Sequence, residues 1–342
     1  MLILDKMSLM NKNIKKILIV RLSALGDIIH SAIVLEFIHQ LYPTAKIEWV
    51  TEEVFAPLLQ NHPLIHAVYS VNIKKLKKEK SFSLLKENIQ QLRSLGNYDI
   101  IIDMQGLIKS AIVARMIGKN THGFDKHSTR ESFASFFYKT TSNISYETNV
   151  IKRNCFVVSD ALGFSISDTM ILNKKAIFPI TKKFNFQSHE KKIAFVIGAS
   201  WKSKIYPKEL VVEVVHALKE KCFIIWASEE EKANAEFICE RTEFATLTPK
   251  LTLNELISFI SSMDLVIGND TGPTHVAWAQ NIPSITLFAP TNTRMMSETP
   301  KNIALESSSK VDILHINKND FSIKTIDYKQ VVTTAKDLLH GL

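Results

Sequence analysis

Short apolar runs alternate with amphipathic helical stretches twice along this chain, and that repetition constrains the fold more than any other feature. Strands separated by helices pair in parallel, so the pattern predicts a doubly wound α/β sheet in each half. A run such as 100–102 is apolar throughout, as a strand covered by helices on both faces requires. The predicted strands are 17–20, 46–50, 67–71 and 99–103, then 193–197, 222–226, 264–267 and 284–288.

Helices are expected between these strands, and a polar, irregular segment separates the two halves. We therefore predict two Rossmann-like domains, 1–170 and 191–325, whose ligand loops face each other across a cleft, joined by a linker at 171–190. The last segment, 326–342, is a helix that could pack back on the first domain. The predicted helices are 27–41, 53–61, 83–95, 109–117, 207–218, 229–242, 253–261 and 328–339.

Composition indicates a soluble globular protein, since 46% of the 342 residues are hydrophobic and 22% are charged. No apolar run reaches the roughly 18 residues that a spanning helix needs. Residues 1–16 are too quickly interrupted by charge for a signal peptide, so a cytoplasmic location is expected. Cys155, Cys222 and Cys239 have no metal or redox spacing, and the 11 histidines form no paired-ligand motif, so no metal is expected.

The net charge of +8 is concentrated in the first half of the chain. Residues 1–170 carry 21 basic and 15 acidic side chains, against 21 and 19 in residues 171–342. Part of the excess lies in the basic run 74–80, which is either a solvated loop or a site of attraction to an anionic surface. Phospholipid is favoured over nucleic acid, because no nucleic-acid-binding motif accompanies the charge.

The segment 268–275 (GNDTGPTH) predicts an anion site in the second half. It breaks an apolar strand at Gly268 and leads into a helix, so unpaired N–H groups and the helix dipole point at one place. Thr271, Thr274 and His275 add further donors, and Pro273 suits the first helical turn. The alternative is an ordinary strand-to-helix turn.

Three other loops carry candidate chemistry, although no dinucleotide or P-loop motif is present. Asp27 follows the first strand and is either a helix N-cap or a general base. Lys202 and Lys204 follow the strand 193–197 and could neutralise a diphosphate. The acidic run 229–231 either complements a helix dipole or accepts hydrogen bonds from a ribose diol.

Three motifs together resemble the bacterial lipopolysaccharide heptosyltransferases of glycosyltransferase family 9, and heptosyltransferase I most of all. They are VRLSALGD at 20–27, DMQGLIKS at 103–110 and NDTGPTH at 269–275. Their joint occurrence in this order is specific, and the likeness runs from about residue 15 to the end. It implies a GT-B fold and an inverting, metal-independent transfer of L-glycero-D-manno-heptose from ADP-heptose to a Kdo residue of Kdo–lipid A.

The resemblance also assigns roles to individual residues. Asp27 matches the catalytic base and Lys204 the lysine that stabilises the departing diphosphate. Trp201 and Lys202 depart from the family pattern, which has an arginine and an acid there. No cofactor or metal is implied. The remaining matches are donor-binding Ser200, Glu229, Leu251, Asp270, Thr271, Gly272 and His275, and acceptor-binding Lys109 and Arg130.

The expected partners are therefore ADP-heptose, Kdo–lipid A and the cytoplasmic face of the inner membrane, which the protein would contact peripherally. Two alternatives stay open. The chain could be heptosyltransferase II or a later core glycosyltransferase of the same family, or it could bind a nucleotide sugar without catalysis.

Overall fold

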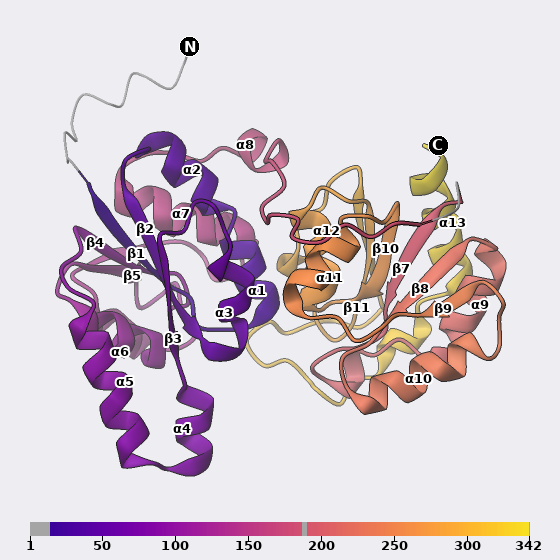
Figure 1. The fold of residues 1–342 in the computed structure, drawn as a ribbon, viewed down its shortest axis with the longest axis horizontal. Coiled ribbons are helices and arrows are strands. Elements are labelled where there is room, and N and C mark those ends of the chain that lie inside the picture. Colours follow the sequence, from indigo (N-terminus) through magenta and orange to yellow (C-terminus); the bar gives the residue numbers. More distant parts are fainter. Residues whose placement is uncertain (1–13, 187–189, 342) are drawn as a thin grey trace. The chain divides into compact units, whose positions relative to one another are not determined.

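The computed structural model describes residues 14–186 and 190–341 and divides into two compact units, one up to Lys174 and one from Lys175 onward. Each unit is a parallel six-stranded sheet with helices on both faces (Figure 1). The predicted pair of Rossmann-like domains is therefore confirmed. The prediction that their ligand loops face each other across a cleft stays a prediction.

The sheet of the first unit has the strand order β3-β2-β1-β4-β5-β6, and every neighbouring pair is parallel. Helices α5 and α6 cover one face, where Leu92 and Val113 join a cluster with Leu18, Val20 and Ile101 of the sheet. Helices α1 and α2 pack against α7. The strands are β1 Lys16–Val20, β2 Lys46–Glu52, β3 Ala67–Val71, β4 Ile100–Asp103, β5 Thr121–Phe124 and β6 Thr140–Ser142. The helices are α1 Leu25–Ser31, α2 Val34–Leu41, η2 Glu53–Phe55, α3 Ala56–Gln60, α4 Ile73–Glu79, α5 Phe82–Ser94, α6 Ile108–Ile117, η3 Ser132–Phe137, α7 Val150–Leu162 and α8 Asp168–Leu172.

The second unit repeats this topology in the order β12-β11-β10-β7-β8-β9. Its main cluster joins α9, α10 and α13 to the sheet through residues such as Val214, Ala235, Val331 and Phe195. The strands are β7 Lys192–Val196, β8 Lys221–Ile225, β9 Ala245–Leu247, β10 Leu265–Asn269, β11 Ser284–Phe288 and β12 Asn302–Glu306. The helices are η4 Lys202–Lys204, α9 Lys208–Leu218, α10 Glu229–Cys239, α11 Leu253–Ile260, α12 Gly272–Ala279, η5 Thr293–Met295, η6 Ser322–Thr325 and α13 Tyr328–His340.

Both sheets follow the doubly wound order in which the chain builds outward in one direction and then returns to the other side of its first strand. The reversal lies between β1 and β4 in the first unit and between β7 and β10 in the second. In sheets of this order, ligands bind outside the carboxyl ends of the strands at the point of reversal. The candidate residues that follow β1, β4, β7 and β10 lie at these two places.

Several local predictions differ from the structure. The helix expected at 27–41 is divided into α1 and α2, and the Ser31 hydroxyl donates to the Asp27 carbonyl (2.7 Å), a bond that bends helices. The basic run 74–80 is not a loop, because it lies largely in α4. Strands β5, β6, β9 and β12 were not predicted. Three of them, β5, β6 and β9, have four residues or fewer, and β6, β9 and β12 are sheet edges.

The segment expected to be a linker is hydrogen-bonded to helices of the second unit. Backbone N–H groups of Ile177 and Thr181 donate to the carbonyl of Ala279 (3.0 Å) and to the hydroxyl of Ser258 (3.1 Å). The last helix, α13, packs against α9 of the same unit. Within the described ranges, no helix is long and apolar enough to cross a membrane.

Candidate functional site

Asp270 is the centre of the candidate site in the second unit. It directly follows β10, and its carboxylate accepts hydrogen bonds from three side chains, two of which follow the neighbouring strands β7 and β11. Lys204, after β7, donates to the carboxylate and also to the Asp270 carbonyl (2.9 Å). Thr291, after β11, donates to Oδ2 (2.6 Å), and Nε2 of His275, in α12, lies 2.9 Å from Oδ1. All four residues are buried.

The charges in this cluster are tightly coupled. Burial alone raises the pKa of the Asp270 carboxyl, but the hydrogen bond with His275 and the charge of Lys204 together lower it well below its ordinary value. Asp270 is therefore ionised at neutral pH. The Lys204 ammonium gives two of its three N–H bonds to Asp270, which leaves one that can reach a ligand.

Asp270 was predicted to bind the donor, and that stays a prediction. Both of its carboxylate oxygens also accept hydrogen bonds from protein side chains. Its immediate effect is to hold Lys204 and His275 in place at the edge of the sheet. Thr291 was not singled out from the sequence. The signal that could have found it is its position, three residues after the apolar strand β11.

Close packing holds the loop before α12 in position. A Cβ added to Gly268 would lie 2.6 Å from the Thr274 hydroxyl oxygen and 2.7 Å from Val196 Cβ, so only glycine fits. The Asn269 amide donates to the Ile197 carbonyl (2.9 Å) and accepts from the Tyr206 N–H (3.0 Å), which ties the loops after β7 and β10 together. Helix α12 begins at Gly272 with Thr271 as N-cap, so its first N–H groups point to this edge, as predicted for an anion site.

Three other predicted donor-binding residues, Ser200, Glu229 and Leu251, follow β7, β8 and β9 at the carboxyl edge of the same sheet. Ser200 and Glu229 are exposed, and Leu251 is half-buried just before α11. The Glu231 side chain, in the same acidic run, bonds the backbone before its own helix. Its carboxylate accepts from the Ala227 N–H (2.7 Å) and fills the space beside Gly198, where a Cβ would clash with it.

Asp27 is the central carboxylate of the first unit's candidate site. It is the third residue of α1 rather than its N-cap, which is Ala24, because its own carboxylate accepts from the Ala24 N–H (3.1 Å). The guanidinium of Arg21, buried after β1, lies 2.9 Å from Asp27 Oδ1. The Asp27 side chain is 27% exposed, so it is oriented by protein groups and still open to a ligand.

The loop after β4 joins this site. Gln105 accepts from the Leu22 N–H (2.8 Å), and the Lys109 ammonium lies 3.3 Å from the Ser23 hydroxyl. Lys109 is thus beside the loop that carries Asp27. Arg130 is exposed and makes no ion pair within the described part of the chain.

Two further carboxylates in the first unit serve structure. Glu131 accepts from the Ile108 N–H (2.7 Å) and so completes the start of α6. Asp103, at the end of β4, is fully buried and accepts from the Tyr138 hydroxyl (2.7 Å) and the Gln105 N–H (2.8 Å). Burial raises the pKa of the Asp103 carboxyl, although these hydrogen bonds oppose the shift.

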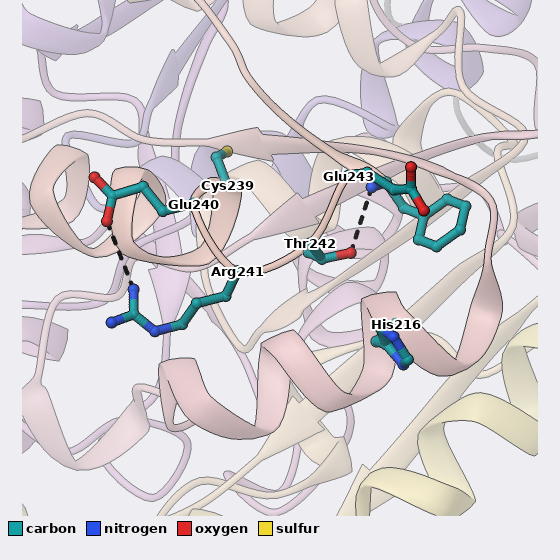
Figure 2. A pocket seen from close by; sticks show the side chains of 7 residues that line it. His216, Cys239, Glu240, Arg241, Thr242 and Glu243 are labelled. Atoms are coloured by element: carbon teal, nitrogen blue, oxygen red, sulfur yellow. Dashed lines mark hydrogen bonds and ion pairs between the residues drawn. The ribbon is translucent and has the colours of Figure 1, made fainter.

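A pocket of about 470 Å³ lies elsewhere on the second unit (Figure 2). It is lined by His216 of α9 and by residues 239–244, where Arg241 lies 3.6 Å from Glu240. These residues precede β9 and therefore lie at the amino edge of the sheet, opposite the candidate site. Among the described residues, no group of three His, Cys, Asp or Glu side chains is placed to hold a metal ion.

Comparison with known proteins gives a consistent result. The model of glycosyltransferase family 9 (heptosyltransferase) matches residues 87–322. A lipopolysaccharide heptosyltransferase 1 from Campylobacter coli is 37% identical over 94% of this chain and 98% of its own length. The protein of the same name from Escherichia coli K12 is 27% identical over 88% of this chain and 96% of its own.

Solved structures agree on the fold. The Escherichia coli heptosyltransferase WaaC with ADP has a TM-score of 0.82 at 24% identity, covering 94% of this chain and 99% of that one. WaaC with ADP-2-deoxy-2-fluoro heptose gives a TM-score of 0.78 at 23% identity, with the same coverage. This likeness confirms the predicted GT-B type of fold.

Proposed function

Because this chain belongs to glycosyltransferase family 9, the heptosyltransferases, we propose that it transfers L-glycero-D-manno-heptose from ADP-heptose to a Kdo residue of Kdo–lipid A. This is the first addition of heptose to the lipopolysaccharide inner core. The observation that carries the proposal is the likeness to a lipopolysaccharide heptosyltransferase 1 along nearly the whole of both chains. The two candidate sites supply the chemical groups that such a transfer needs.

The donor, in this proposal, binds to the second unit. The relative WaaC has been solved with ADP and with ADP-2-deoxy-2-fluoro heptose, which supports a nucleotide-heptose site here. The diphosphate would accept hydrogen bonds from the N–H groups that begin α12 and from the remaining N–H of Lys204. Ser200 and Thr271 would bind phosphate or sugar oxygens, Glu229 the ribose, and Leu251 the adenine.

The acceptor would bind to the first unit, with Lys109 and Arg130 beside its anionic groups. The Kdo hydroxyl oxygen attacks the anomeric carbon of heptose, the bond from that carbon to the diphosphate oxygen breaks, and Asp27 takes the hydroxyl proton. Arg21 keeps the Asp27 carboxylate in one orientation. ADP leaves with the bonding electrons, and inversion follows from this single displacement.

We propose that this transfer needs no metal. The negative charge that develops on the leaving diphosphate would be stabilised by the Lys204 ammonium and the start of α12, which are preorganised by Asp270 and Gly268. The acceptor is a membrane glycolipid, so the protein would work peripherally at the cytoplasmic face of the inner membrane. The basic first half of the chain supports that location.

One experiment tests the reaction and separates the alternatives. The purified chain is incubated with ADP-heptose and either Kdo–lipid A or the already heptosylated acceptor, and the products are analysed by mass spectrometry. We expect addition of one heptose to Kdo–lipid A. Transfer to the heptosylated acceptor alone would instead assign heptosyltransferase II or a later core enzyme. Binding of ADP-heptose with no product on either acceptor would indicate a non-catalytic nucleotide-sugar-binding protein.

A further inference from the structure

The short helix η3 has one apolar edge inside the first unit and another outside it. Residues three apart share an edge of a 3₁₀ helix. Ala134 is fully buried in a small cluster with Ala111 of α6, and Phe137 packs against this cluster. On the other edge Phe133 is 70% exposed and Phe136 is 79% exposed, with ring centroids 5.9 Å apart. We call this pair the aromatic edge.

Basic side chains lie along the same segment of chain. Lys126 and Arg130 are both exposed in the loop that leads into η3. The two acidic residues of this loop are both engaged by protein donors: Asp125 accepts from the Ser128 hydroxyl (2.6 Å) and Glu131 from the Ile108 N–H (2.7 Å). The Ile108 side chain is itself 36% exposed. Neighbouring exposed rings with a charged rim mark a surface that binds another protein or a membrane.

The charge of the first half favours a lipid bilayer as the partner of this surface. Residues 1–170 hold six more basic than acidic side chains, which complements the anionic phosphates of a membrane surface. Aromatic rings lie favourably at the headgroup level, with lysine and arginine beside the phosphates. The aromatic edge and its basic loop match this arrangement.

We propose that the aromatic edge docks the first unit on an anionic phospholipid bilayer. Phe133 and Phe136 insert at the headgroup level, and Lys126 faces the lipid phosphates. Ile108 connects this surface to the acceptor site, because the next residue, Lys109, lies 3.3 Å from the Ser23 hydroxyl. The docking rests on the proposed function and extends it, since it would bring the acceptor site to its lipid substrate. Binding to vesicles can be measured without catalysis.

The test uses sedimentation of the full chain with vesicles of phosphatidylcholine, with and without phosphatidylglycerol. The parent chain should bind the anionic vesicles and not the neutral ones. Phe133→Ser/Phe136→Ser should bind about thirtyfold more weakly, as expected for two half-buried rings. The matched control is Phe321→Ser, which removes an exposed phenylalanine (49%) of the second unit. This control variant should bind vesicles like the parent chain.

A second variant keeps the proposal testable if the double serine variant does not fold. Phe136→Trp should show a blue-shifted emission with anionic vesicles and more quenching by brominated lipid than the parent chain. Unchanged vesicle binding by the serine variant, or no added quenching of the tryptophan, would overturn the docking.

Activity separates this inference from the proposed function. The serine variant should transfer heptose normally to a water-soluble, deacylated Kdo acceptor and poorly to acceptor in vesicles. Normal vesicle binding with loss of transfer only to acylated acceptor would mean that the rings hold the acceptor's own acyl chains, which overturns bilayer docking. Absence of transfer by the parent chain to any acceptor would refute the proposed function and leave vesicle binding to be judged by itself.

Discussion

The pair formed by Asp270 and Lys204 should dominate the stability of the second unit's site. Asp270→Asn keeps the side chain's shape and removes its charge, so the Lys204 ammonium, whose side chain is only 10% exposed, loses its counter-ion. Removing one partner of a buried pair costs about 3–5 kcal/mol, and we expect about 4 kcal/mol here. Adding Lys204→Met should restore about half of the loss, because neither charge then remains.

Urea unfolding followed by tryptophan fluorescence measures this effect. The Trp49→Phe background confines the signal to the second unit, since the other three tryptophans, Trp201, Trp226 and Trp278, all belong to it. With a slope of about 2 kcal/mol per molar urea, Asp270→Asn should lower the midpoint by about 2 M. A shift of less than about 0.5 M, or a double variant that equals the sum of its singles, would refute the reasoning.

The same variant has a defined pH dependence. The pKa of the Asp270 carboxyl is lower in the folded chain than its ordinary value of 3.8, because the hydrogen bond with His275 and the charge of Lys204 outweigh burial. Such a carboxyl stabilises the folded state above the unfolded pKa and loses this contribution as the pH falls. The deficit of Asp270→Asn should therefore be full near about pH 6 and shrink below about pH 4. A deficit that stays constant over this range would contradict the assignment.

Four other outcomes are expected. Asp27→Asn should lower the transfer rate at least about 100-fold with little change in donor affinity, and near-normal turnover would remove its assignment as base. EDTA should leave the rate unchanged, whereas a strict need for Mg²⁺ would contradict the metal-free proposal. Gly268→Ala should destabilise the second unit by roughly 1–3 kcal/mol in thermal unfolding, because its methyl group meets the Thr274 hydroxyl at 2.6 Å. Tyr138→Phe should cost about 1–3 kcal/mol in the first unit, since Asp103 loses a buried donor; a neutral result would mean that water replaces it.

The fold was predictable because its central strands are apolar on both faces. Strands β1, β4, β7 and β10 stand out from the sequence, since each is buried between helix layers. Two of the strands that were missed, β6 and β9, have only three residues, and β6, Thr140–Ser142, is largely exposed at the sheet edge. Their pairing with a neighbour, rather than their own composition, makes them strands.

The location of the site was predictable and its internal contacts were not. Polar residues after apolar strands indicated where Asp27, Lys204 and Asp270 would lie. Their partners depend on strand order, which the sequence pattern does not contain. Thr291 reaches Asp270 only because β11 lies beside β10, and Lys204 reaches it only because β7 lies on the other side.

Burial and partners together distinguish the carboxylates that these strands present. Asp103 ends β4 and Asp270 follows β10, so both come from the fourth strand of equivalent sheets, and both are buried. The donors to Asp103 that are described above are uncharged and its pKa is raised, whereas Lys204 joins the donors to Asp270 and the pKa of Asp270 is lowered. Both are enclosed by protein donors, whereas a base must touch the proton that it takes. Asp27 differs in being more than a quarter exposed and held by Arg21 through one oxygen, so its exposure is what favours it as the proposed base.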